Sequence, residues 1–360
     1  ASIVGFKIGH AHVDEIDVLK LMEGRETAAP VSVPENALDI LVNMAIGAPA
    51  VCLYRLLRPD EASAREAADR IFVSMFNKAE SAAIIDLLYS RKNDDAYYEN
   101  VFQYCVDGNL QAVLEEYGHM VTLNGDRLAQ EMADAFADTV SLQMDTDESF
   151  ASAGREKPRI RCHFAVGYFN ARLSDDSALR ADKIRKAFNS PFRPFVLATT
   201  SIGQEGLDFH CYCRKVMHWN LPANPVDLEQ REGRVNRYKC LAVRQNIAQR
   251  YGSEKTWEAM FAMASQTEKG TMPDLVPYWC LTQPNTTAVK IERIVPMYPF
   301  SLDRVRYQRI IKLLSLYRLT LGQPRQEELI EVLSREADQS ILDELFMQLS
   351  PYYRQQEELV

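Results

Sequence analysis

The sequence predicts an α/β protein in which one parallel-sheet domain is flanked by mostly α-helical N- and C-terminal modules. Apolar residues recur every three or four positions through residues 1–135 and much of residues 253–360, as in amphipathic helices. Between these modules, short apolar runs separated by turns and helices predict the strands of an α/β domain. A chain of 360 residues has room for two or three domains, which we place at residues 1–135, 136–252 and 253–360.

The N-terminal module is expected to consist of helices joined by turns. Its most apolar stretch, residues 37–57, is interrupted by Asp39, Pro49 and Arg55 and is therefore not expected to span a membrane. Asp107-Gly108-Asn109 is a turn signal that divides one long helical pattern. The expected helices lie within residues 37–45, 62–76, 80–89 and 97–117.

The central domain is expected to contain four short strands. These are residues 139–144, 160–169, 195–198 and 216–219. A polar loop follows the first strand, and a helix at residues 174–188 precedes the third. A second helix is expected to begin at Asn224-Pro225, because Asn is a favoured cap and Pro is favoured at the first helical position.

The C-terminal module is expected to be an accessory helical unit. Its predicted helices are residues 242–251, 254–265, 302–319, 325–335 and 339–349. Ser301 is expected to cap the third of these and Gly322 to end it. Residues 276–281 are expected to be extended, and residues 287–295 to form a strand.

Charge is unevenly distributed along the chain. The formal net charge is −9, which excludes a polycation that coats nucleic acid, yet residues 155–193 carry ten Lys/Arg against four acids. We call residues 155–193 the basic block. It fits either a phosphate-contacting surface or a solvated helix face. Seven scattered cysteines favour a reducing cytoplasm over a disulfide framework, so we expect a cytoplasmic protein.

Residues 194–238 place polar side chains at the ends of predicted strands, where open α/β sheets bind ligands. Hydroxyl groups and glycines follow the strand at residues 195–198, and Asp208 comes next. The helix that begins at Asn224-Pro225 is expected to carry Arg234 and Arg237, which are three residues apart and would share one face.

Two segments of this stretch match motifs of a known family. Residues 230–237, QREGRVNR, match Q-x-x-G-R-x-x-R, which is motif VI of superfamily-two helicases and translocases. Thr200-Ser201 and Gly206-Leu207-Asp208 match motif V. Residues 139–242 therefore resemble the second RecA-like domain of this family, which includes the Swi/Snf and RapA-like branches. The family often has Asp in place of Asn220 and Gly in place of Asn236, and neither difference affects the arginines.

The resemblance implies half of an ATP site beside a surface that binds the DNA or RNA backbone. It implies that the catalytic residues are two arginine fingers and a glutamine near the γ-phosphate, Arg234, Arg237 and Gln230. The residues implied to approach the cofactor, ATP with Mg²⁺, are Gly206, Asp208 and Gly233. Those implied or expected to contact nucleic-acid phosphates are Thr200, Ser201, Lys183, Arg185 and Lys186.

The other half of an ATP site is not encoded here. No G-x-x-x-x-G-K-[ST] P-loop occurs in the sequence, and Asp60-Glu61-Ala62-Ser63 resembles a metal-binding acidic box only superficially. The chain begins at Ala1 rather than Met, so we expect a fragment whose first RecA-like domain is missing. This chain alone is therefore expected to be inactive as an ATPase. The alternative is a catalytically silent helical scaffold with a degenerate RecA-like domain.

Two further groups of residues carry potentially reactive side chains. The side chains of His210, Cys211, Cys213, His218 and Cys240 offer zinc-ligand atoms, but the C-x-C spacing is tighter than in usual structural sites, so we expect no metal. Adjacent Cys162 and His163 would point to opposite faces of a strand, which excludes a nucleophilic pair.

Overall fold

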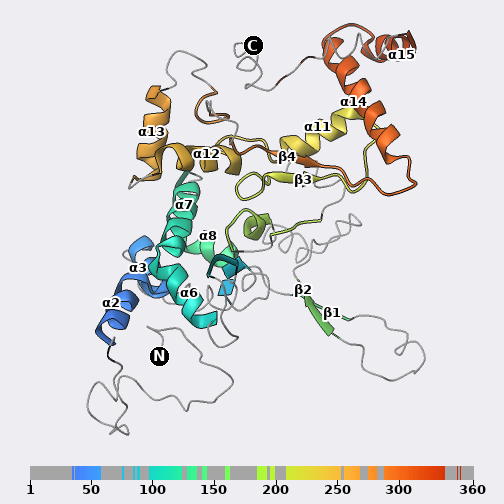
Figure 1. The fold of residues 1–360 in the computed structure, drawn as a ribbon. Helices are drawn as coiled ribbons and strands as arrows, with labels where there is room; N and C mark the ends of the chain where they lie inside the picture. Colours follow the sequence, from blue (N-terminus) through green and yellow to red (C-terminus); the bar gives the residue numbers. More distant parts are fainter. Residues whose placement is uncertain are drawn as a thin grey trace, which may run out of the picture. The chain divides into compact units, whose positions relative to one another are not determined.

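A computed structural model describes the parts of the chain discussed below. These are residues 35, 37–57, 75–76, 84–85, 87–89, 97–123, 128–135, 140–143, 159–162, 185–192, 195–198, 208–252, 255–267, 275–281, 288–336, 347 and 349. The chain divides into two compact units, residues 1–198 and 199–360, each of which has its own arrangement of elements (Figure 1). The predicted three-domain division stays a prediction.

Helices dominate the described part of the first unit. They are α2 (Ala37–Gly47), α3 (Pro49–Leu56), α6 (Tyr97–Val106), α7 (Asn109–Leu123) and α8 (Leu128–Ala135). Gly108, at φ +83°, forms the predicted turn between α6 and α7. Leu53 and Leu114 are fully buried where α3 packs against α7. At Gly47, α2 and α6 approach so closely that a Cβ on residue 47 would lie 2.8 Å from Val106 Cα.

Two short strands also belong to the first unit. The strands β1 (Val140–Gln143) and β2 (Arg159–Cys162) pair antiparallel, with Val140 opposite Cys162. They confirm the first two predicted strands in part, but their antiparallel pairing differs from the predicted parallel sheet. The residues between them lack an apolar helical pattern, whereas parallel strands need a crossover connection that covers the sheet.

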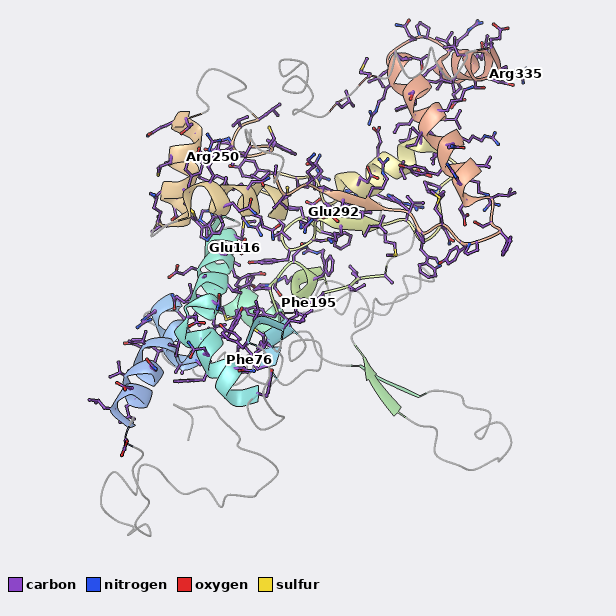
Figure 2. The ribbon with its side chains drawn as sticks, viewed as in Figure 1. Phe76, Glu116, Phe195, Arg250, Glu292 and Arg335 are labelled. Carbon is purple, nitrogen blue, oxygen red and sulfur yellow. The ribbon has the colours of Figure 1, made fainter. Side chains whose placement is uncertain are left out.

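The second unit contains a parallel strand pair with helices around it. The strands are β3 (Lys215–Met217) and β4 (Glu292–Ile294), and Val216 lies opposite Arg293. Arg214 and Lys215 form ion pairs with Glu292, which Figure 2 labels on β4. The pairing joins a strand of the predicted RecA-like domain to a strand of the predicted C-terminal module.

The helices of the second unit follow the predicted order. They are α11 (Pro225–Gly233), α12 (Leu241–Tyr251), α13 (Trp257–Thr267), α14 (Asp303–Leu319) and α15 (Gln326–Glu336). Ile247 of α12, Phe261 of α13 and Leu281 share one buried apolar core. Gly322, at φ +78°, lies in the turn that follows the end of α14 at Leu319. The N-cap of α14 is Leu302 rather than the predicted Ser301, although the Ser301 hydroxyl accepts a hydrogen bond from the Asp303 amide at 3.3 Å.

Two predicted extended segments are wrong. Residues 195–198 form no strand and pair with none of the four described strands. Val196 is 85% exposed. An apolar run becomes a strand only where another backbone pairs with it. Residues 276–281 begin as a turn in which the amides of Trp279 and Cys280 both donate to Leu275 O. Most of each predicted helix at residues 62–76, 174–188 and 339–349 lies outside the described residues. Within the described part, no helix is long and apolar enough to cross a membrane.

Candidate functional site

The helix α11 carries the first half of the site, and local sequence determines where it begins. The Asn224 side chain accepts a hydrogen bond from the Val226 amide at 2.9 Å, and Pro225 occupies the first helical turn. This cap satisfies an amide that the helix itself cannot, so the predicted helix start is confirmed. Leu228 is fully buried and holds α11 against the rest of the unit.

The end of α11 corrects one prediction. The helix stops at Gly233 with Arg234 as its C-cap, so Arg237 lies beyond the helix rather than on its face. Past Gly233 the backbone bonds span three residues, from the Arg234 amide to Arg231 O and from the Val235 amide to Glu232 O. The Arg234 carbonyl accepts a hydrogen bond from the Phe209 amide at 2.9 Å, which joins the end of α11 to the segment after Asp208. Gln230 and Arg234 are four residues apart and lie on the same side of α11. Arg237 was predicted to share this helical face with Arg234, but it lies beyond the end of the helix.

The motif V and motif VI segments meet at Asp208 and Arg237. Arg237 Nε lies 3.1 Å from Asp208 Oδ1, and the two side chains are 39% and 47% exposed. The Leu241 amide donates to His210 O at 3.0 Å, which lays residues 208–210 along the segment that follows α11. A guanidinium and a carboxylate distant in sequence therefore lie together at a partly open surface.

The remaining described site residues of α11 are accessible. Gln230 is exposed, and Arg234 is partly exposed. A Cβ built on Gly233 would meet nothing within 4 Å, so open space rather than close packing surrounds this glycine. The structure thus places Gln230, Gly233, Arg234, Arg237 and Asp208 in one region. Gly206, Thr200 and Ser201 lie outside the described residues, as does Lys183.

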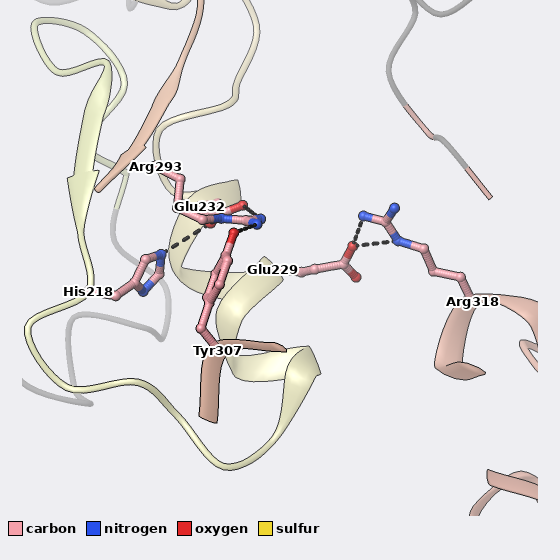
Figure 3. A network of polar contacts seen from close by, with 6 residues as sticks. All are labelled: His218, Glu229, Glu232, Arg293, Tyr307 and Arg318. Atoms are coloured by element: carbon pink, nitrogen blue, oxygen red, sulfur yellow. Dashed lines mark hydrogen bonds and ion pairs between the residues drawn. The ribbon is translucent and has the colours of Figure 1, made fainter. Parts of the chain in front are cut away.

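Two acids of α11 hold the helix in place, as Figure 3 shows. Glu229 accepts hydrogen bonds from Arg318 of α14, the longer at 3.0 Å from Nε. Glu232 lies 3.1 Å from the buried His218 Nε2 and 2.8 Å from Arg293 Nη2, and Arg293 Nη1 lies 3.2 Å from the Tyr307 hydroxyl. The acids therefore brace α11 through partners other than the motif VI arginines.

The electrostatics of Glu232 follow from this network. Burial by itself would raise the pKa of the Glu232 carboxyl, but hydrogen bonds from Arg293 and His218 outweigh it and lower that pKa to about 2. The carboxylate is consequently charged in the folded protein over the whole physiological pH range.

Arg244 holds two loops of the site together, and the sequence analysis did not identify it. Its side chain is fully buried and donates to Lys239 O at 2.8 Å and to Cys211 O, while its guanidinium carbon lies 5.3 Å from the centre of the Tyr212 ring. It thereby ties the loop after Asp208 to the loop after Arg237. The available signal was an arginine inside the apolar face of α12, between Val243 and Ile247.

His210 lies in the same charged environment. Burial lowers the pKa of the His210 imidazole, and the nearby Arg244 and Arg237 lower it further against the opposing effect of Asp208. The loop beside Asp208 therefore favours a neutral imidazole at neutral pH.

The described end of the basic block belongs to the first unit. Lys186 Nζ forms an ion pair with Glu131 Oε1 at 2.9 Å, so this lysine also braces α8. Arg185 is partly exposed. The neighbouring Phe192 packs edge-on against Tyr117 of α7, with ring centroids 5.2 Å apart. These contacts fix the position from which Arg185 and Lys186 present their charges.

The cysteines of the loop at residues 210–213 make local contacts. Cys211 Sγ lies 3.9 Å from His210 Nε2, and Cys213 Sγ lies 3.3 Å from the Lys215 carbonyl oxygen. Burial raises the pKa of the Cys213 thiol, which favours the protonated form. Among the described residues, no group of three or more His, Cys, Asp or Glu side chains could hold a metal ion.

Comparison with known proteins identifies the class of domain that surrounds this site. Residues 142–239 match the family model described as the helicase conserved C-terminal domain. This segment is therefore similar to helicase C-terminal domains, which are RecA-like α/β domains, and the matched region ends just after Arg237. Searches of curated proteins and of solved structures found no match.

Proposed function

We propose that this chain supplies the second half of an ATP site in a nucleic-acid helicase or translocase of superfamily two. The observation that supports it most directly is the 3.1 Å approach of Arg237 to Asp208 within the matched domain. The Arg237 side chain is partly exposed and the Asp208 side chain is nearly half exposed, so both are accessible to solvent.

The chemistry requires cations that face a nucleotide from a second domain. As the γ-phosphoryl group is transferred, negative charge spreads over its oxygens, and arginines that neutralise this charge accelerate the reaction by about 10³–10⁵. We assign this role to Arg234 and Arg237, and the orientation of the γ-phosphate or attacking water to Gln230. Asp208 would accept hydrogen bonds from the ribose, and the backbone at Gly206 and Gly233 would approach the nucleotide. Bound ATP with Mg²⁺ would supply the phosphoryl group and a charge-neutralising cation.

The phosphate cradle of the proposed site must come from elsewhere, because this sequence contains no P-loop. We infer a first RecA-like domain as its partner, in the same natural polypeptide or in a complex. The residues of this chain fit that arrangement: the arginines and Gln230 are accessible, and the acids of α11 are engaged by Arg318, Arg293 and His218.

The chain by itself is expected to hydrolyse no ATP, because it lacks both the P-loop and the metal-binding acid of a complete site. Phosphate release from the purified chain should equal that of a blank, with and without nucleic acid. The natural polypeptide or complex that also contains a P-loop domain should show nucleic-acid-stimulated turnover. Robust turnover by the purified chain, with contaminating ATPases excluded, would contradict the proposal.

The proposal also gives the basic block a role on the nucleic-acid backbone. Replacing Lys183 and Arg185 by glutamate is expected to weaken binding to a DNA or RNA oligonucleotide and to flatten its salt dependence. With fewer phosphate contacts, fewer counterions are released when the protein binds. Lys186→Glu should do the same but also destabilise the first unit, since it breaks the pair with Glu131. Glu131→Gln serves as the control: it removes that pair and should not weaken binding. Titrations at several salt concentrations measure both effects, and unchanged affinity and slope would make the block a solvated face.

A further inference from the structure

A cluster of exposed aromatic side chains lies just beyond the carboxyl ends of β3 and β4. Trp219 is 67% exposed, Tyr298 is 48% exposed and Phe300 is completely exposed. The Trp219 and Tyr298 rings are in edge-to-face contact, with centroids 6.0 Å apart. Phe300 has φ +62°, a backbone conformation that bulky L-residues rarely adopt. These large aromatic rings are therefore exposed to solvent and lie outside the apolar core.

The helix α14 adds positive charge beside this cluster. It carries five basic residues and one acid, and its buried side includes Ile310 and Leu314. Arg304 and Arg309 are exposed on the two flanks of this buried side, and no ion pair engages either of them among the described residues. We call Trp219, Tyr298, Phe300, Arg304 and Arg309 the basic aromatic surface.

Contacts within the second unit fix the aromatic cluster and α14 to the same strand end. The Tyr307 hydroxyl of α14 lies 3.2 Å from Arg293 Nη1 on β4, and the His218 amide before Trp219 donates to Ile294 O at 2.9 Å. Between the rings and the helix, the Ser301 hydroxyl donates to Tyr298 O at 2.8 Å in a tight turn. The arginines and the rings are therefore parts of one braced structure.

We infer that the basic aromatic surface binds single-stranded nucleic acid, with bases stacked on Trp219 and Phe300 and phosphates contacted by Arg304 and Arg309. Aromatic faces stack on any base, and unpaired guanidinium groups attract phosphate, so the combination fits a single strand without base preference. The inference rests on the proposed function in that it adds a strand contact outside the basic block and outside the residues assigned to ATP. A protein partner would use the rings but would not need the charge, and an anionic membrane would use both.

The stacking half of the inference is tested with a fluorescein-labelled oligothymidylate and the 360-residue chain, by anisotropy. Trp219→Ala and Phe300→Ala should each weaken binding by roughly fivefold or more, as expected for the loss of one stacked base. Trp219→Phe should bind within about twofold of the unmodified chain, because phenylalanine also offers a stacking face. Binding should quench tryptophan fluorescence, and Trp219→Phe should abolish most of that quenching.

The charge half is tested with a matched pair of double variants. Arg304→Glu with Arg309→Glu should weaken binding and reduce the slope of log affinity against log salt by about 0.7 per lost phosphate contact. Arg325→Glu with Arg335→Glu makes the same change in net charge at exposed positions, the second labelled on α15 in Figure 2, and should alter both quantities much less. Thermal melts confirm that each variant is folded.

Three results would overturn the inference: unchanged affinity in Trp219→Ala and Phe300→Ala, equal effects of the two arginine pairs, or binding to phosphatidylserine vesicles without binding to the oligonucleotide. None of them bears on the proposed ATP site, whose test is phosphate release in the presence of a P-loop domain. Loss of ATPase in an Arg237 variant with intact strand binding would likewise leave the inference in place.

Discussion

Replacing Arg234 or Arg237 by alanine is expected to lower kcat for nucleic-acid-stimulated ATP hydrolysis by about three to five orders of magnitude in the natural protein or complex. Each arginine would stabilise charge that develops only in the transition state, so ATP binding should weaken far less than kcat. Steady-state phosphate release and an independent measurement of ATP affinity separate the two effects.

The fold should survive both substitutions. Arg237 is 39% exposed, and its partner Asp208 is 47% exposed, so truncation leaves no charge buried without a partner. Arg237→Lys should not restore kcat, because lysine lacks the planar fork that reaches two oxygens. Arg231→Ala is the matched control: this arginine lies on α11, three residues before Arg234, and donates to Asn220 O at 3.0 Å, and kcat should be retained. A lower melting temperature with unchanged kcat in the Arg234 and Arg237 variants would favour the scaffold alternative.

Glu232→Gln is expected to destabilise the second unit by about 2 kcal/mol, because a charge-assisted acceptor is lost and the amide cannot serve both partners equally. The carboxylate lies 2.8 Å from Arg293 Nη2 and 3.1 Å from His218 Nε2, and the His218 side chain is fully buried. For a unit of this size, that loss lowers the melting temperature by about 4–8 °C. Glu331→Gln is the control, since its pair with Arg335 is well exposed and should contribute no more than about 0.5 kcal/mol.

The same carboxylate predicts a pH dependence with a definite sign. Its pKa is about 2 in the folded protein and 4.5 in the reference state, so its stabilisation is fully present above pH 4.5 and is lost as the pH falls toward 2. Denaturant unfolding of the unmodified chain and of Glu232→Gln should therefore differ most near neutral pH and converge toward pH 2. A difference that is constant between pH 7 and pH 3 would show that the network does not depend on the charge of Glu232.

Features that depend on neighbouring residues were predictable from the sequence. The start of α11 required only Asn224 and Pro225, and the division between α6 and α7 required only the turn at Gly108. The family match at residues 142–239 likewise agrees with the motifs, because a motif is a local pattern of residue types. Several helix boundaries were correct within a few residues because apolar periodicity is local too.

The tertiary structure alone decided which distant groups meet. The Phe209 amide donates to Arg234 O just beyond the last residue of α11, and no local signal encodes that partner. The pairing of β3 with β4 and the burial of Arg244 depend in the same way on segments remote in sequence. Residues 195–198 were mistaken for a buried strand because apolarity shows that a segment can be buried, whereas a strand exists only where another backbone pairs with it. The sequence by itself therefore predicted the type of domain, and the long-range hydrogen bonds and ion pairs decided how the motif residues are arranged.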